Sequence, residues 1–240
     1  MDTWQGSANV HSYECNASGR MRPEALLHWI QDAAEAHASA LGFGYDWGRE
    51  QGLAWVETAV NLRMHRWPAW KEMTAFRTWT GIASPVQARR RFELCDAEGM
   101  LLAEADCLWV LIDVERRRPV PLKRMGSLLP AEECAAVVPT LPAWVSGSED
   151  SSTERTLRVT ERDIDFNGHV NNASYLVWAI DDLCERGFCG GSLREIHLAF
   201  RKETLLHEEV SIACGMVPGR TRHLVASGGT VRAEVDLVWQ

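Results

Sequence analysis

Apolar residues recur along the first half of the chain with a helical period and then with an alternating one. Pro23 suits a first helical turn and Gly42 a helix C-cap, so we predict a helix over 23–41. The positions between them that recur at helical spacing are Leu26, Leu27, Ile30, Ala33, Ala34 and His37. Four runs with strand character follow, at 53–63, 73–80, 86–95 and 101–114. The segment Asp96-Ala-Glu-Gly99 predicts a hairpin connection between the last two runs.

The second half of the chain repeats this order of elements. A short strand near 156–159 precedes a predicted helix over 171–184. Pro218-Gly219 and Gly228-Gly229 then separate predicted strands, which are expected near 196–203, 209–217, 223–227 and 230–239.

The two halves also align in residue identity. Setting Trp29 over Trp178 pairs Gly19 with Gly168 and Leu27 with Leu176 without a gap. The same alignment places Asn16, Ser18 and Arg20 over Asp165, Asn167 and His169. Only the second copy therefore has an acid and an imidazole at these positions, which indicates two structural repeats of which one has a chemical site.

A single helix followed by a long antiparallel meander buries its apolar stripe when the sheet wraps around it. We therefore expect an α+β fold of the tandem (double) hot-dog type, with two helices each wrapped by a mainly antiparallel sheet. The expected division is an N-terminal unit at 1–127, a Pro-, Ala-, Gly- and Ser-rich linker at 128–152 and a C-terminal unit at 153–240.

Composition narrows the function classes. The 240 residues are 46% hydrophobic, which is ordinary for a globular protein, and the formal charge of −8 argues against general nucleic-acid binding. Seven scattered cysteines without a CxxC pair favour reduced thiols over a zinc site, and we expect no metal and no cofactor. The chain has no apolar run of signal-peptide or membrane-spanning length, so a cytoplasmic protein is expected.

The run Asp165-Phe-Asn-Gly-His169-Val-Asn-Asn172 is the strongest candidate for chemistry. Alternate residues of an extended segment share one face, so Asp165, Asn167 and His169 are expected to converge on one pocket beside a helix start. Such a trio supplies a base or nucleophile, an orienting amide and a proton carrier. Read alone, the run also fits a polar turn that caps a helix.

Taken together, these residues resemble the acyl-acyl carrier protein thioesterases, the plant fatty-acyl thioesterases and their bacterial relatives. The similarity extends over nearly the whole chain. It rests on Trp55-Val-Glu-Thr58, Met64-His-Arg-Trp-Pro68, Leu108-Trp-Val-Leu111, the 165–172 run and Leu198-Ala-Phe-Arg-Lys-Glu203.

The resemblance implies hydrolysis of fatty acyl-acyl carrier protein, which releases free fatty acid and terminates fatty acid synthesis. It implies catalytic roles for Asp165, Asn167, His169 and Glu203. One carboxylate would activate water or attack directly, and unpaired amides at 170–172 could bind the oxyanion. Many plant members have a cysteine after the glutamate. Because Thr204 stands there, a thiol nucleophile at that place is not expected.

The substrate requires an apolar tunnel and a docking surface. We expect the acyl chain between the first helix and the sheet, lined by Leu26, Ile30, Ala34, Trp55 and Val60. Carrier protein is acidic, so a basic patch is expected to bind it. The candidates are Arg89, Arg90, Arg91, Arg116, Arg117, Arg118, Lys123 and Arg124.

Alternatives remain open at this point. The same site could hydrolyse acyl-CoA, and a hydroxyacyl-thioester dehydratase also pairs an acid with a histidine. A non-catalytic acyl-binding module is a further alternative, although such a module is expected to lack part of the catalytic set, and Asp165, Asn167, His169 and Glu203 are all present. A homodimer is expected by family analogy alone.

Overall fold

The computed structural model describes residues 3–129, 138–140, 154–188 and 191–240. The chain divides into two compact units, Met1–Pro139 and Thr140–Gln240. Most of the predicted linker at 128–152 lies outside the described residues.

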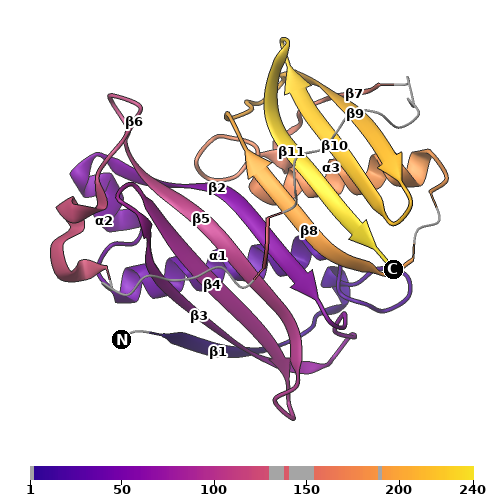
Figure 1. The fold of residues 1–240 in the computed structure, drawn as a ribbon, viewed down its shortest axis with the longest axis horizontal. Helices are drawn as coiled ribbons and strands as arrows, with labels where there is room; N and C mark the ends of the chain where they lie inside the picture. The colour runs from indigo at the N-terminus through magenta and orange to yellow at the C-terminus, as the bar shows by residue number, and fades with distance from the viewer. Residues whose placement is uncertain (1–2, 130–137, 141–153, 189–190) are drawn as a thin grey trace. The chain divides into compact units, whose positions relative to one another are not determined.

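The first unit is an antiparallel sheet with a long helix on one face (Figure 1). Its strand order is β1-β3-β4-β5-β2, and the short β6 pairs with β5. The elements are β1 (Trp4–Asn9), η1 (Ser12–Glu14), α1 (Pro23–Ala40), α2 (Tyr45–Gln51), β2 (Leu53–Met64), β3 (Met73–Ser84), β4 (Gln87–Asp96), β5 (Leu101–Asp113), β6 (Arg118–Pro119) and η2 (Leu122–Leu128).

The second unit has the same plan with a shorter helix. Its strand order is β8-β11-β10-β9-β7, with antiparallel pairing between the strands. The elements are β7 (Arg155–Arg158), η3 (Glu161–Asp163), α3 (Asn172–Glu185), β8 (Leu193–Phe200), β9 (Glu209–Val217), β10 (Arg220–Ser227) and β11 (Thr230–Trp239).

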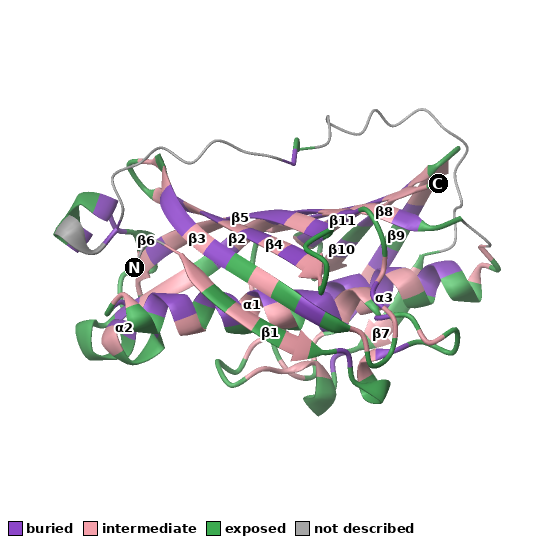
Figure 2. Ribbon diagram, turned by 90° about the horizontal axis from the view of Figure 1, so that it is seen from below, coloured by how far each residue is buried: buried purple, intermediate pink, exposed green. Residues whose placement is uncertain are grey.

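Each core lies between the helix and the sheet of its own unit. Figure 2 shows buried residues along α1 and strands banded with buried and partly exposed positions. Leu26, Leu27 and Ile30 are at most 2% exposed on α1, as is Leu176 on α3. Burying these side chains against the strands supplies the main stabilisation of each unit, at roughly 2–3 kcal/mol for a large side chain. The predicted tandem of helix-and-sheet units is confirmed.

The element boundaries follow the local signals closely. Gly42 has a φ of +84° just after α1, where a C-cap glycine was predicted. Asp96 and Gly99 form the predicted hairpin connection, in which Asp96 accepts from the Met100 amide (2.8 Å). The sequence predicted a strand that extends to Glu203, but strand β8 ends at Phe200. Glu203 therefore lies in the segment that follows the strand.

The internal repeat is reproduced in side-chain contacts. Trp29 Nε1 donates to Glu14 Oε1 (2.7 Å), and Trp178 Nε1 donates to Asp163 Oδ1 (3.3 Å). Glu14 and Asp163 each end a 3-10 helix and close its capping box, and the same 149 positions separate them as separate the two tryptophans. The repeat predicted from aligned identities is therefore confirmed within each unit.

Candidate active site

The run that begins at Asp165 forms a tight turn. The predicted extended segment is wrong, because Gly168 takes a φ of +79° and its amide donates to the Asp165 carbonyl (3.0 Å). A bridge between Ile164 and Val170 closes the turn. Asp165 Oδ1 accepts from the Asn167 amide (2.8 Å), and Asn167 Nδ2 lies 3.5 Å from Asp165 Oδ2. The turn therefore brings the carboxylate and the carboxamide together at the surface.

His169 pairs with Glu203 across the same unit. His169 Nε2 lies 3.3 Å from Glu203 Oε2, and the two side chains are 41% and 28% exposed. Both groups are therefore accessible to a substrate and to water while they remain in contact. An imidazole beside a carboxylate can hold and transfer a proton.

Backbone contacts around Thr204 position this pair. The Val170 amide donates to the Thr204 carbonyl (2.9 Å), which ties the start of α3 to the segment after β8. Thr204 is fully buried, and its hydroxyl accepts from Tyr175 on α3 (2.9 Å). Arg232 Nη1 on β11 donates to the Glu203 carbonyl (2.8 Å). These bonds fix the backbone at Glu203 and directly after it, so the contact with His169 follows from the fold.

The sequence suggested oxyanion donors among the amides of 170–172, and two of these three amides already have acceptors within the protein. The Val170 amide is used by Thr204, and the Asn171 amide donates to the Asp163 carbonyl (2.8 Å). The Asn171 side chain caps the helix by accepting from the Ala173 amide (2.9 Å). Both amides are therefore occupied, and the prediction fails for Val170 and Asn171.

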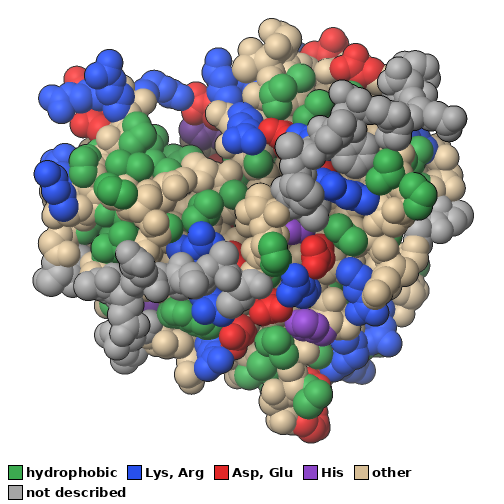
Figure 3. Space-filling model, in the orientation of Figure 1, with side chains coloured by type: hydrophobic (Ala, Val, Ile, Leu, Met, Phe, Trp, Pro, Cys, Tyr) green, Lys and Arg blue, Asp and Glu red, His purple; other side chains and the backbone are tan. Residues whose placement is uncertain are grey.

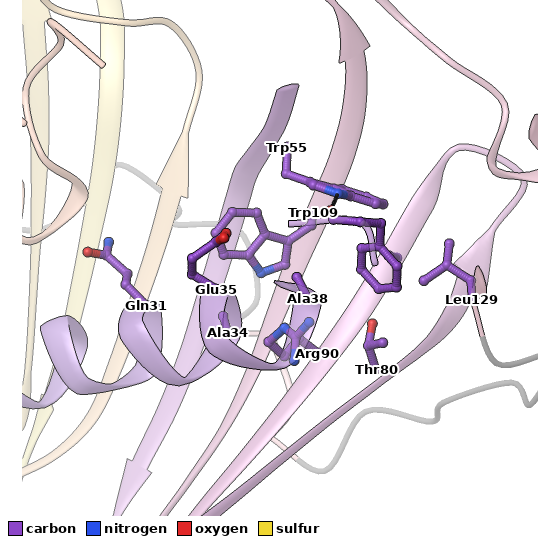
Figure 4. Close-up of a pocket in the computed structure, with 11 residues that line it drawn as sticks. Gln31, Ala34, Glu35, Ala38, Trp55, Thr80, Arg90, Trp109 and Leu129 are labelled. Atoms are coloured by element: carbon purple, nitrogen blue, oxygen red, sulfur yellow. Dashed lines mark hydrogen bonds between the residues drawn. The ribbon is translucent and has the colours of Figure 1, made fainter. Parts of the chain in front are cut away.

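An apolar cavity lies inside the first unit, between α1 and the sheet (Figure 4). Ala34 and Trp55, two of the five residues expected around the acyl chain, line it. Leu26, Ile30 and Val60 are buried in the core and are not among its lining residues. The complete lining is Gln31, Ala34, Glu35, Ala38, Phe43, Trp55, Thr80, Ala88, Arg90, Trp109 and Leu129.

The two arginine clusters differ in exposure. Arg90 is only 5% exposed and lines the cavity, so its assignment to a docking surface is wrong. Its neighbours Arg89 and Arg91 lie on the other face of β4, where Arg89 approaches Asp106 (3.8 Å) and Arg91 lies over the Trp79 ring (4.8 Å).

The second cluster is at the surface. Its exposed members are Arg116, Arg117, Arg118, Lys123 and Arg124. Figure 3 shows Lys and Arg side chains gathered at the β6 end of the first unit. This basic group keeps the exposure that docking to an acidic protein requires.

A buried cluster in the second unit was missed from the sequence. Donor atoms of Asp182, Cys214 and His223 lie within 4.8 Å of one another, a spacing that could hold a metal ion. Burial opposes ionisation of Asp182, but the close approach of His223 Nε2 (3.5 Å) and the hydrogen bond from Arg186 lower its pKa to about 2. Burial also raises the pKa of the Cys214 thiol to about 11. Because Arg186 already neutralises the carboxylate (2.7 Å) and the thiol stays protonated, the cluster fits a buried ion-pair network better than a metal site.

Among the described residues, every helix is too short or too polar to cross a lipid bilayer.

Comparisons with known proteins cover both units. Residues 2–124 match the acyl-ACP thioesterase N-terminal domain and residues 146–240 match the acyl-ACP thioesterase C-terminal domain. Oleoyl-acyl carrier protein thioesterase 2 of Arabidopsis thaliana is 25% identical over 215 residues, which span 81% of this chain and 58% of that protein. The Coriandrum sativum oleoyl-acyl carrier protein thioesterase is 24% identical over 84% of this chain and 59% of its own. The chain thus spans less than two thirds of the length of these relatives.

Solved structures agree on the fold. An acyl-ACP thioesterase from Bacteroides thetaiotaomicron has a TM-score of 0.87 at 21% identity, over 100% of this chain and 98% of that one. The 12:0-ACP thioesterase from Umbellularia californica has a TM-score of 0.86 at 20% identity, over 100% and 98%. The match of two consecutive domain models to almost the whole chain shows that this protein belongs to the acyl-ACP thioesterase family.

Proposed function

We propose that this protein hydrolyses the thioester of fatty acyl-acyl carrier protein, releasing free fatty acid and ending acyl-chain synthesis. The observation that supports this most is the accessible pair of His169 and Glu203 at 3.3 Å, in a chain that belongs to the acyl-ACP thioesterase family. The names of its relatives point to the same substrate class.

In the proposed reaction Glu203 acts as the general base. A water oxygen attacks the thioester carbon while Glu203 accepts the water proton, aided by the adjacent His169. The carbon–sulfur bond then breaks, and the thiolate takes up the proton or leaves as the anion near neutral pH. Asp165 and Asn167, joined in one turn, orient the carbonyl and the water.

The end of the acyl chain is proposed to bind in the cavity of the first unit, with Ala34 and Trp55 in its wall. The exposed basic group is proposed to bind the acidic carrier protein. Its members are Arg116, Arg117, Arg118, Lys123 and Arg124. The five described free thiols, Cys15, Cys95, Cys107, Cys184 and Cys214, fit a protein that acts in the cytoplasm. A homodimer is part of the proposal by family analogy only.

Acyl-CoA hydrolysis is the second candidate, because the same pair could attack either thioester. The test is hydrolysis of a chain-length series of acyl-acyl carrier protein by the purified protein, with matched CoA esters in parallel. A higher kcat/KM for the carrier-protein series supports the proposal. Preference for CoA esters would transfer it to the second candidate, and binding without turnover would favour an acyl-binding module.

A further inference from the structure

The cavity of the first unit contains a buried cation. Arg90 on β4 is 5% exposed, and its Nη1 donates to His37 Nδ1 on α1 (2.9 Å) and to the Thr78 hydroxyl (3.3 Å). A guanidinium only donates, so His37 accepts at Nδ1 and is neutral. Among the described residues, no carboxylate forms an ion pair with Arg90. Its direct hydrogen-bond partners are therefore neutral, and the Glu35 carboxylate, which also lines the cavity, acts on its charge without forming an ion pair.

Arg90 nevertheless remains charged at neutral pH. Burial lowers its pKa to about 10, against the opposing influence of Cys107, Glu35 and Glu57. A buried charge without an ion-pair partner costs stability unless hydrogen bonds satisfy it. An apolar cavity meant for hydrocarbon alone is better lined by aliphatic side chains than by a guanidinium.

A second donor faces the same cavity. Trp109 Nε1 on β5 is buried and has no hydrogen-bond partner among the described residues. Ala88 lies opposite Trp109 and Arg90 opposite Cys107 in the β4–β5 ladder, so Arg90 and Trp109 share the helix-facing side of the sheet. Figure 4 shows the Trp109 ring nitrogen on the side of the ring nearer Arg90. A buried N–H without an acceptor is rare in native proteins and indicates a missing partner.

Trp55, which lines the same cavity, differs from Trp109 because its ring N–H has a hydrogen-bond acceptor in the protein. Its Nε1 donates to the Phe43 carbonyl (3.1 Å), so this tryptophan is satisfied by the protein itself. The cavity thus has largely apolar walls that also carry the polar side chains of Gln31, Glu35 and Thr80 and two N–H donor groups, and Trp109 Nε1 has no acceptor in the described part of the chain. That arrangement binds an oxygen acceptor carried by an otherwise apolar ligand.

The cavity is small. Its volume is about 70 Å³, and since an apolar cavity of about 150 Å³ holds a benzene ring, this one holds only a few atoms. It therefore receives the end of a chain and not a whole ligand.

We propose that this cavity recognises acyl groups that carry an oxygen atom, as a hydroxyl or carboxyl group, at the end remote from the thioester, and that Arg90 and Trp109 bind this oxygen. The inference rests on the proposed function, because it treats the cavity as the site of the acyl chain. It defines the substrate class as chains oxidised at the far end, in addition to plain fatty acyl groups. The reaction that supplies such substrates must hydroxylate or oxidise the chain terminus.

The experiment compares three carrier-protein thioesters of one chain length that end in a methyl, a hydroxyl or a carboxyl group. The wild-type protein is expected to show roughly tenfold higher kcat/KM for at least one oxygenated substrate, the gain expected from a hydrogen bond to a charged donor. The hydroxyl and carboxyl arms distinguish the two oxygen sources. Trp109→Phe removes one donor, and Arg90→Met removes the other.

Both variants are expected to lose this preference, measured as the ratio to the methyl substrate in the same variant. Trp55→Phe is the matched control, because its N–H is already satisfied, and it is expected to keep the ratio. A wild-type preference for the methyl substrate, or an unchanged ratio in both variants, would overturn the inference.

Direct binding separates this inference from the proposed function. Non-hydrolysable acyl-carrier-protein amides that end in a methyl, a hydroxyl or a carboxyl group are titrated into the wild-type protein and both variants by calorimetry, with thermal melts to verify folding. Tighter binding of an oxygenated ligand that depends on Trp109 and Arg90 supports the site even if no thioester is hydrolysed. Equal affinities in all proteins would overturn it even if hydrolysis proceeds.

Discussion

His169 Nε2 lies 3.3 Å from Glu203 Oε2, although α3 and β8 separate the two residues in the sequence. The contact depends on the bond between the Val170 amide and the Thr204 carbonyl, which joins the neighbours of both residues. The candidate catalytic pair is therefore held by backbone hydrogen bonding, and its side chains remain partly exposed for chemistry.

Asp165→Asn is expected to lower turnover by removing a carboxylate charge while leaving the stability of the fold almost unchanged. The first unit contains the equivalent turn with an asparagine, where Asn16 Oδ1 accepts from the Ser18 amide (3.0 Å). The variant should therefore keep its turn and change the free energy of unfolding by less than about 1 kcal/mol. Turnover is expected to fall by at least about tenfold, because the carboxylate charge is lost. Thermal melts beside steady-state hydrolysis test this, and wild-type turnover in a folded variant would contradict it.

The Tyr175–Thr204 hydrogen bond is expected to stabilise the second unit. Thr204→Val leaves the largely buried Tyr175 hydroxyl without this acceptor, which should lower the free energy of unfolding by roughly 1–3 kcal/mol. Tyr175→Phe removes the other partner. The double variant should lose less stability than the sum of the single variants, as measured by denaturant unfolding. Strict additivity would show that the bond contributes nothing.

Asp182 is expected to link stability to acid pH. Its folded pKa of about 2 is below the ordinary value of 3.8, so the carboxylate stabilises the folded state above the ordinary pKa. This contribution is lost as the pH falls from about 4 to about 2. Asp182→Asn should lower the free energy of unfolding by roughly 1–3 kcal/mol at neutral pH, and the difference from wild type should shrink across that window. A constant difference would contradict the linkage.

The exposed basic group is expected to raise kcat/KM for carrier-protein substrates and not for CoA esters. Arg116→Glu combined with Lys123→Glu should lower kcat/KM for acyl-acyl carrier protein by roughly tenfold and weaken its salt dependence. The CoA ester should be hydrolysed with little change. Arg49→Glu combined with Arg158→Glu is the control, because it makes the same charge change at other exposed positions. Equal effects of the two double variants would exclude a local docking surface.

The fold could be predicted from the sequence because its signals are local. Pro23 and Gly42 bracket α1, and the aligned pair of Trp29 and Trp178 predicts two units that the structure builds with equivalent capping contacts. Helix α2 was missed, because it has seven residues with Gly48 near its middle, which is too short and too glycine-rich for a periodic signal.

The site could be predicted only in part. The contact between His169 and Glu203 is long-range, and the residues became candidates together only through the family resemblance. The turn at Gly168 was read as an extended segment, because alternation alone does not reveal a positive φ. Arg90 was grouped with its neighbours, although the middle of three residues in a strand faces the opposite side from the other two.

The most direct test is single-turnover hydrolysis of fatty acyl-acyl carrier protein by Glu203→Gln and His169→Ala, with Asp181→Asn as a control that removes an exposed charge from α3. The first two variants should retain the wild-type melting temperature and lose at least about a hundredfold in the rate of the chemical step, while the control keeps the wild-type rate. Wild-type rates in both folded variants would contradict a catalytic role for the pair.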